Sequence, residues 1–189
     1  MIHQFIIPRM KRQEGVSLIV AMVFLIILSM LAIAAIRGVT MQERMAGNTQ
    51  DWNLAFQAAE AALRDAEIDI RASGRIRGME GFTNNCGGGL CLPSENGTPV
   101  WRVTTNWHNN SVAYGAITLA APLPEVNTLP RYIIEALGAV GNNSLAPPDY
   151  TNNRLPYHAY RITAIGFGNI LDSTGNPAIR VFTQSVFTN

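Results

Sequence analysis

The chain has 189 residues, of which 48% are hydrophobic and 14% are charged, and its formal net charge at pH 7 is +1. This length leaves room for one domain besides a membrane segment. A nearly neutral chain without a basic stripe lacks the usual electrostatic footprint of a nucleic-acid-binding protein, so we expect no nucleic-acid partner.

An apolar segment near the N-terminus is the most distinctive feature of the sequence. No charged residue lies between Glu14 and Arg37. As a helix, this segment would extend for about 33 Å, which is enough to cross the hydrocarbon core of a bilayer. The sequence therefore predicts that residues 16–36 form a transmembrane half of a longer helix.

A short basic leader, residues 1–15, precedes this segment. Its basic residues are Arg9, Lys11 and Arg12. By the positive-inside rule, the N-terminus stays in the cytoplasm and everything after Arg37 faces outward. Either Met1 or Met10 can be the start of the leader.

The helical pattern continues through residues 37–72, which we expect to form the amphipathic outer half of the same helix. Apolar residues recur in steps of three and four at Trp52, Ala55, Phe56, Ala59, Leu63, Ala66 and Ile70. Charged residues at Asp51, Glu60, Arg64, Glu67 and Arg71 are expected on the opposite face. We predict that the helix packs on a sheet through Trp52, Phe56, Leu63, Ala66 and Ile70.

Residues 73–189 have the composition of a β-rich head. Five runs rich in β-branched and aromatic residues are candidate strands: 100–107, 112–119, 132–140, 157–170 and 178–187. The last two flank a turn-like segment, residues 172–177, and are expected to form an antiparallel hairpin. The prediction is an α+β fold in which an antiparallel sheet of four to five strands covers the outer half of the helix.

Two cysteines, Cys86 and Cys91, flank a run of three glycines and a leucine. In an exported domain, such a close pair indicates a small disulfide loop, which the chain-entropy model values at about 2 kcal/mol. The alternative is half of a metal site. That alternative needs further ligands, and no histidine is close in sequence.

Catalytic and cofactor motifs are absent from the sequence. It contains no GxSxG elbow, phosphate-binding glycine loop, HExxH or EF-hand spacing. Asp149 and Asp172 have asparagine oxygens nearby, but neither stretch supplies the alternating carboxylates of a tight calcium site. We expect no enzymatic activity, no cofactor and no bound metal. The polar loop at residues 142–155 is either a partner contact or an ordinary surface loop.

Several blocks of the sequence resemble PilX-type minor pilins of bacterial type IV pili. These blocks are the basic leader ending in Gly15, the apolar helix, QERMAGN at 42–48 and NLAFQAAEAALRDAE at 53–67, with looser similarity in RYIIE at 131–135 and YRITAIGFG at 160–168. The resemblance implies the pilin fold. It also implies that a prepilin peptidase cuts between Gly15 and Val16, and that the new amino group of Val16 is methylated.

Val20 occupies the fifth position of the expected mature chain, where pilins usually carry a glutamate. A carboxylate at that depth in lipid needs a compensating partner. In pilins the proposed partner is the amino terminus of a neighbouring subunit. A subunit without the carboxylate cannot neutralise the amino terminus of a subunit above it. This favours a place at the fibre tip, where no subunit lies above. PilX-type proteins share this absence. The alternative is that Val20 simply belongs to an ordinary membrane anchor.

The resemblance thus implies a minor pilin that helps to prime type IV pilus assembly and sits in the tip complex. It would span the inner membrane once before assembly and belong to the fibre afterwards. The implied partners are other minor pilins, the major pilin, a tip adhesin and the prepilin peptidase. One alternative is the tip pseudopilin of a type II secretion system, although those proteins usually have a larger outer domain. Another is a periplasmic binding protein, either signal-anchored or cleaved after Ala34.

Overall fold

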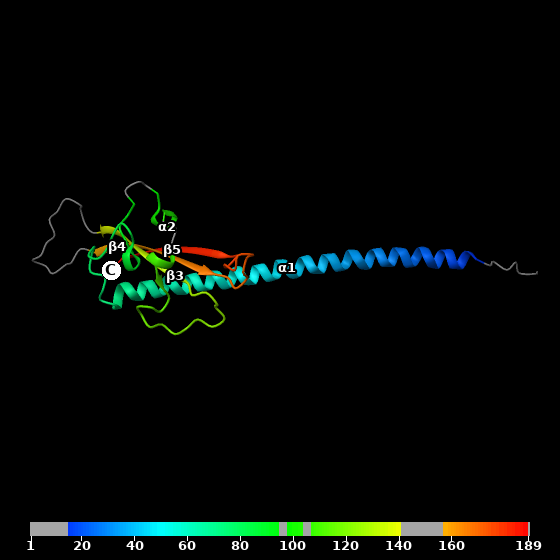
Figure 1. The fold of residues 1–189 in the computed structure, drawn as a ribbon, viewed down its shortest axis with the longest axis horizontal. Helices are drawn as coiled ribbons and strands as arrows, with labels where there is room; N and C mark the ends of the chain where they lie inside the picture. Colours follow the sequence, from blue (N-terminus) through cyan, green and yellow to red (C-terminus); the bar gives the residue numbers. More distant parts are fainter. Residues whose placement is uncertain (1–14, 95–97, 104–106, 141–156, 189) are drawn as a thin grey trace, which may run out of the picture. The chain divides into compact units, whose positions relative to one another are not determined.

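The computed structural model describes residues 15–94, 98–103, 107–140 and 157–188 (Figure 1). The elements, in chain order, are α1 (Val16–Ala72), η1 (Gly87–Gly89), β1 (Leu90–Cys91), α2 (Val100–Val103), α3 (Trp107–Asn110), β2 (Val112–Ala113), β3 (Arg131–Val140), β4 (Tyr157–Phe167) and β5 (Arg180–Thr188). Contacts divide the chain into two units, residues 1–47 and residues 48–189, and α1 contributes to both.

In the first unit, the described residues form the N-terminal part of α1. Gly15, with a φ of +109°, directly precedes the helix, and Val16 is its first residue. No proline interrupts the sequence from here to Ala72. The side chains of residues 15–46 are exposed.

In the second unit, α1 ends at Ala72 because the next residues favour a helix terminus. The backbone N–H of Ser73 donates to the carbonyl of Asp69 and closes the last turn. Gly74 then adopts a φ of +70°, a left-handed conformation that glycine allows without strain.

The sheet has five strands in the order β1-β3-β4-β5, and β2 also pairs with β3. The long strands β3, β4 and β5 form two antiparallel pairs. The α+β fold is therefore confirmed, but the sheet is mixed, because β1 runs parallel to β3. This parallel pair is only two residues long, and neither residue belongs to a predicted strand.

Three of the five predicted strands are confirmed as β3, β4 and β5, and the last two form the predicted hairpin. The strand predicted at 100–107 is wrong, because the described residues there form the helical turns α2 and α3. The strand at 112–119 stops at Ala113, since Gly115 (φ +73°) and Leu119 (φ +58°) turn the chain back.

Hydrophobic residues are buried on both faces of the sheet. Between α1 and the sheet, the core contains Leu63, Ala66, Ile70, Tyr132, Ile134, Tyr160 and Ile162. On the opposite face, Ile133 packs with Cys86, Cys91 and Val100, flanked by Trp101 and Trp107. The second unit is therefore a three-layer structure of helix, sheet and covering loops.

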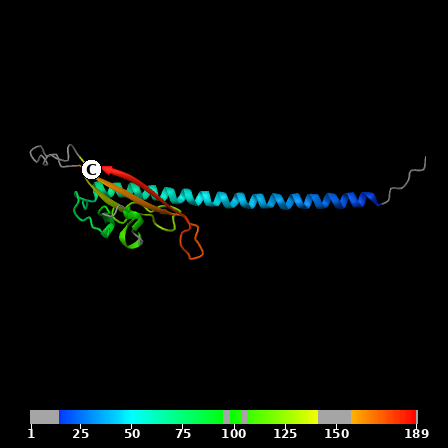
Figure 2. The same ribbon diagram turned by 90° about the horizontal axis from the view of Figure 1, so that it is seen from above.

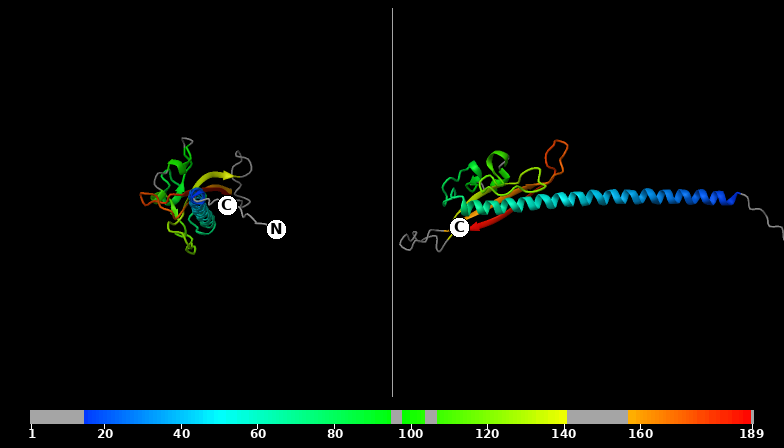
Figure 3. Two further views of the ribbon diagram at one scale, coloured as in Figure 1. Left: turned by 90° about the vertical axis from the view of Figure 1, so that its right-hand side faces the viewer. Right: turned by 90° about the horizontal axis from the view of Figure 1, so that it is seen from below.

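Seen from above and from below, β5 extends past one side of the outer half of α1 (Figures 2 and 3). The green segments between α1 and β3, including α2, lie on the other side. In these two views, the outer half of α1 therefore projects between β5 and these loops.

Candidate functional site

Three aspartates on α1 are buried: Asp51, Asp65 and Asp69. Asp65 and Asp69 are one turn apart, and Asp51 precedes Asp69 by about five full turns, so all three share one helix face. Burying a carboxylate is costly unless hydrogen bonds compensate for the lost water. Each of these three carboxylates accepts such bonds from a segment that is distant in sequence or follows the helix.

Asp51 holds the segment that follows β4. Its carboxylate accepts hydrogen bonds from the backbone N–H groups of Asn169 and Ile170. A Cβ on Gly168 would lie 2.1 Å from Oδ2 of Asp51, so any larger residue here would displace this carboxylate. The prediction that Asp51 belongs to the solvent face of the helix is wrong, because the chain after β4 returns across this turn of α1.

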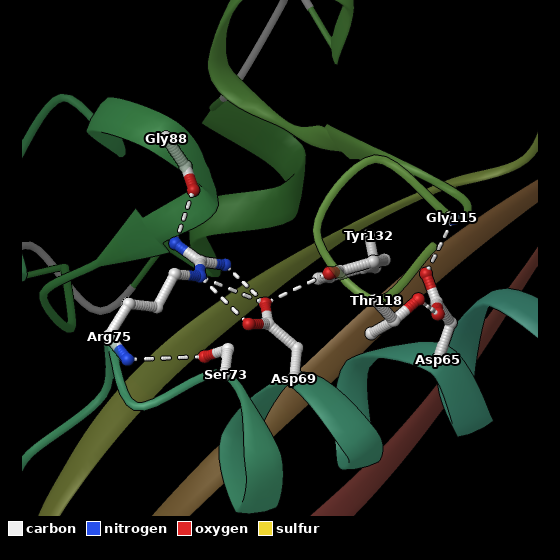
Figure 4. A network of polar contacts seen from close by, with 8 residues as sticks. All are labelled: Asp65, Asp69, Ser73, Arg75, Gly88, Gly115, Thr118 and Tyr132. Carbon is white, nitrogen blue, oxygen red and sulfur yellow. Dashed lines mark hydrogen bonds and ion pairs between the residues drawn. The ribbon is translucent and has the colours of Figure 1, made fainter. Parts of the chain in front are cut away.

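Asp65 holds the loop that follows β2 (Figure 4). The backbone N–H of Gly115 donates to its Oδ2 over 2.8 Å, and the hydroxyl of Thr118 donates to its Oδ1. Gly115 also needs its small size, because an added Cβ would lie 3.0 Å from the carbonyl oxygen of Ala120. Asp65 therefore fixes a tight turn on the helix.

Asp69 joins three parts of the unit (Figure 4). Nε of Arg75 donates to its Oδ1 over 2.8 Å, Nη2 of Arg75 donates to its Oδ2, and the hydroxyl of Tyr132 on β3 donates to Oδ2 over 2.9 Å. Nη1 of Arg75 donates to the carbonyl of Gly88 over 3.0 Å. A chain of charge-assisted hydrogen bonds thus connects α1 to β3 and to the cysteine loop.

The electrostatics of this network favour the charged form of Arg75 and the neutral form of the Tyr132 phenol. Burial, followed by the negative charge of Asp69, raises the pKa of Tyr132, which keeps its proton and acts as a donor. Burial alone would lower the pKa of Arg75, but the hydrogen bond and the charge of Asp69 outweigh it and raise that pKa. The network therefore acts as a fixed clamp rather than as a proton-transfer site.

Cys86 and Cys91 are joined by a disulfide bond, with their Cα atoms 4.1 Å apart. Cys91 lies in β1 opposite Glu135 of β3, which places the loop against the sheet. Gly89 has a φ of +80°, and a Cβ there would lie 2.6 Å from Cγ2 of Val112. The loop is thus held by its covalent bond, by β1 and by Arg75.

Within the described ranges, no group of three or more His, Cys, Asp or Glu side chains is arranged to hold a metal ion. The carboxylate of Asp172 is engaged within its own turn, where it accepts hydrogen bonds from Thr174 and Asn176. These bonds lower the pKa of Asp172, with the hydroxyl of Thr174 as the largest cause. Asp149 and the loop at 142–155 lie outside the described residues.

In the first unit, the exposed surface of residues 16–36 carries no charge and is mostly apolar. α1 is long and apolar enough to cross a membrane, and none of its most hydrophobic window is buried. Val16 and Val20 are among its exposed residues. In water such a surface is unfavourable, and lipid or other apolar helices can cover it.

Two models of known protein families match the chain. A family model described as PilX N-terminal matches residues 14–64, and one described as the C-terminal part of the type IV pilus assembly protein PilX matches residues 87–189. The chain belongs to the PilX family of type IV pilus assembly proteins. No curated protein and no solved structure matches it.

Like other PilX-family proteins, this chain is a pilus component, and members of the family are in general structural rather than enzymatic. Its apolar N-terminal helix can anchor it in a membrane. Membership in a pilus family also indicates interaction with other pilus components.

The PilX-family helix does not bury all the residues expected at its contact with the sheet. Leu63, Ala66 and Ile70 are buried. Trp52 and Phe56 are not: they are 49% and 39% exposed, and their rings stack with centroids 5.5 Å apart.

The reason is the close approach of helix and sheet at this level. A Cβ on Gly166 of β4 would lie 2.0 Å from the carbonyl oxygen of Ala55 and 2.5 Å from the backbone nitrogen of Ala59. Only small residues fit between the two backbones, so the large rings lie beside the contact. Large apolar side chains were therefore wrongly predicted to be buried in this part of the helix.

The residues that sequence reasoning missed are the buried carboxylates Asp65 and Asp69 and the glycines of β4 and its loop. A usable signal was present for the carboxylates. Each follows the small buried residue Ala62 or Ala66 by three positions, which places a charge on the helix face that should be apolar. The pair Gly166 and Gly168 at the end of a β-rich run was a second signal, since glycine inside a strand often marks close backbone approach.

Proposed function

We propose that the chain is a minor pilin that helps to prime type IV pilus assembly, sits in the tip complex and has no catalytic activity. The observation that carries this proposal is the uncharged helix surface that starts at Val16. In particular, Val20 occupies the fifth position after Gly15, and its side chain is exposed.

Processing of the N-terminus is the first step in the life of this subunit. Prepilin peptidase cleaves after Gly15 and removes the leader, residues 1–15, and the amino group of Val16 is methylated. This site coincides with the start of α1, because Gly15 is non-helical and Val16 is the first helical residue. Cleavage ahead of the helix leaves the apolar segment in the mature protein.

Before assembly, residues 16–36 span the inner membrane with the N-terminus in the cytoplasm. The amphipathic outer half of the helix, residues 37–72, and the head, residues 73–189, lie outside. During assembly, helices of other subunits replace lipid around α1. Lipid is as apolar as these side chains, so specificity comes from close packing of helix surfaces.

The uncharged side chain of Val20 favours a position at the top of the pilus fibre. Without a carboxylate at this position, the subunit offers no counter-charge to the amino terminus of a subunit above it, which favours the top of the fibre. Its neighbours are then other minor pilins, the major pilin beneath and a tip adhesin.

N-terminal sequencing of the mature protein tests this proposal directly. A methylated start at Val16 is expected, and a Gly15→Val variant should stay uncut because the peptidase requires glycine. A start at Ala35 or an uncut wild-type chain would contradict the pilin assignment. Gene deletion should remove surface fibres; loss of exported enzymes with normal fibres would favour a secretion pseudopilin instead.

A further inference from the structure

The two edges of the sheet differ in how they are covered. Along the outer edge of β3, both β1 and β2 form backbone pairs. Along the outer edge of β5, the described part of the chain provides no pairing strand. Figures 2 and 3 show why: β5 extends past one side of α1, whereas the covering loops lie on the other.

The register of the hairpin shows which backbone groups face the open edge. The N–H of Gly168 donates to the carbonyl of Ile179, so these residues are a hydrogen-bonded pair. Because such pairs alternate along an antiparallel ladder, Val181, Thr183, Ser185 and Phe187 direct their backbone groups to β4. Phe182, Gln184 and Val186 therefore direct their N–H and C=O groups outward.

This edge lacks the features that normally protect an exposed strand. Natural edge strands are usually short or carry charges, prolines or bulges that prevent pairing with another chain. β5 has nine residues, and after Arg180 it contains neither a charged residue nor a proline. On the sheet face opposite α1, its side chains include Phe182 and Val186, which are 42% and 64% exposed. The ring of Phe182 also contacts Trp101 and Trp107.

The helix-facing side of β5 gives a second, independent observation. The hydroxyl oxygens of Thr183 and Ser185 are buried, yet neither has a hydrogen-bond partner among the described residues. Buried hydroxyls in folded proteins are nearly always paired. Two unpaired hydroxyls on the last strand therefore leave polar groups unsatisfied between β5 and α1, beside the open edge.

We propose that the open edge of β5 binds an extended segment of another pilus protein by strand addition. Backbone hydrogen bonds to Phe182, Gln184 and Val186 supply the affinity. Alternation of the side chains specifies the segment: apolar residues beside Phe182 and Val186, and hydroxyl or amide residues beside Thr183 and Ser185. That the partner is a pilus protein rests on the proposed function, whereas the open edge itself does not.

The test uses the full-length chain in cells that produce the pilus, with the photo-cross-linking residue p-benzoylphenylalanine in place of Val186. Gln184→Pro removes an outward N–H and blocks strand addition, but it takes no hydrogen bond from the β4–β5 ladder. Gln184→Ala is the matched control, because it removes the side chain and its bond to Thr163 but keeps the backbone donor. A second control carries the cross-linker at Ile68, which is exposed on α1.

We expect a cross-link from position 186 to an extended segment of one other pilus protein, identified by mass spectrometry of the joined peptides. Its yield should fall at least tenfold with Gln184→Pro and stay within twofold with Gln184→Ala. The Ile68 position should not give the same adduct. An adduct that persists with Gln184→Pro, one between two copies of this chain, or none at all overturns the proposal.

Two further readouts keep the test decisive. If Gln184→Pro lowers the melting temperature of the purified chain by more than about 10 °C, Val186→Pro replaces it and the cross-linker moves to Gln184. If gene deletion leaves pili intact but position 186 still cross-links a strand of a secretion protein, the pilin function fails while the strand-binding edge stands. If gene deletion removes the pili but position 186 gives no cross-link, the strand-binding edge fails while the pilin function stands.

Discussion

The hydroxyl of Tyr132 on β3 donates a 2.9 Å hydrogen bond to Oδ2 of Asp69 on α1, joining residues 63 positions apart. We expect Tyr132→Phe to lower the free energy of unfolding by about 1.5 kcal/mol, because the bond goes to a charged acceptor. Asp69 keeps its bonds to Arg75, which limits the loss. Denaturant titration of the detergent-solubilised full-length chain, followed by tryptophan fluorescence, measures it.

The buried phenol of Tyr132 makes a pH-dependent contribution to stability, whose sign follows from its pKa, raised first by burial and then by the charge of Asp69. Its stabilisation is fully present below the ordinary tyrosine pKa of 10.0, and it is lost as the pH rises further, because the unfolded chain ionises first. The stability gap between wild type and Tyr132→Phe should therefore narrow above pH 10. Because burial is the largest cause of the raised pKa and the charge of Asp69 the next, a gap that stays constant from pH 8 to pH 11 would show that the phenol is not buried beside Asp69.

The ion pair of Asp69 and Arg75 should contribute far more than the exposed pair on the same helix. Asp69→Asn leaves Arg75 without its charged partner, and breaking such a pair costs about 3 kcal/mol. Glu67→Gln is the control, since Glu67 meets Arg71 at 3.7 Å on the exposed helix surface and should lose only about 0.3 kcal/mol. Equal losses for the two variants, measured by chemical denaturation, would rule out a structural role for the buried network.

Much of the fold was predictable because local patterns encode it. The end of α1 follows from a glycine placed directly after the periodic residues, and β3, β4 and β5 follow from β-branched runs bounded by turn residues. Residues 100–107 have a similar composition but form helical turns in their described part. There, packing of Val100 and Trp107 on the outer sheet face outweighs intrinsic strand preference.

The distant partners of the buried aspartates were not predictable in the same way. The bond from Gly115 to Asp65 spans 50 residues and that from Asn169 to Asp51 spans 118, so no local pattern contains both partners. The open edge of β5 likewise depends on strand order, which periodicity does not reveal. Long-range pairing was the missing information in each case.

The close contact of α1 with β4 gives a prediction about glycine. Gly166→Ala should destabilise the protein by about 3 kcal/mol, because the added methyl group meets the backbone of Ala55 and the helix must move away. Gly47→Ala is the matched control: nothing lies within 4 Å of a Cβ there, and alanine favours a helix. Thermal unfolding of the two variants should differ in direction, and an unchanged melting temperature for Gly166→Ala would refute the close contact.

The buried carboxyl of Glu135 should make the stability of the protein fall as the pH rises. Burial raises its pKa, and the positive charge of Arg161, 3.2 Å away, offsets only part of this effect. The folded chain holds this proton more tightly than the unfolded chain. Stability is therefore greatest below the ordinary pKa of 4.5 and falls as the pH rises through the folded value.

Glu135→Gln should remove this fall, so the variant gains stability relative to wild type between pH 4 and pH 7. Arg161→Gln is the complementary variant, because it removes the stabilising charge and should extend the fall to higher pH. Unfolding free energies at four pH values measure both effects. A wild-type advantage that grows with pH would mean that the ion pair outweighs burial.

Val20 allows the tip position itself to be tested. Val20→Glu supplies the carboxylate that other pilins carry, so the subunit can now neutralise the amino terminus of a subunit above it, and immunogold label should spread from the fibre tip along the shaft. A carboxylate in the bilayer costs a few kcal/mol, so the amount of protein in the membrane should fall somewhat. Val20→Gln is the control, because it is polar and similar in size but uncharged; its label should stay at the tip. If Val20→Glu is still confined to the tip at normal abundance, the missing carboxylate does not determine where this subunit sits.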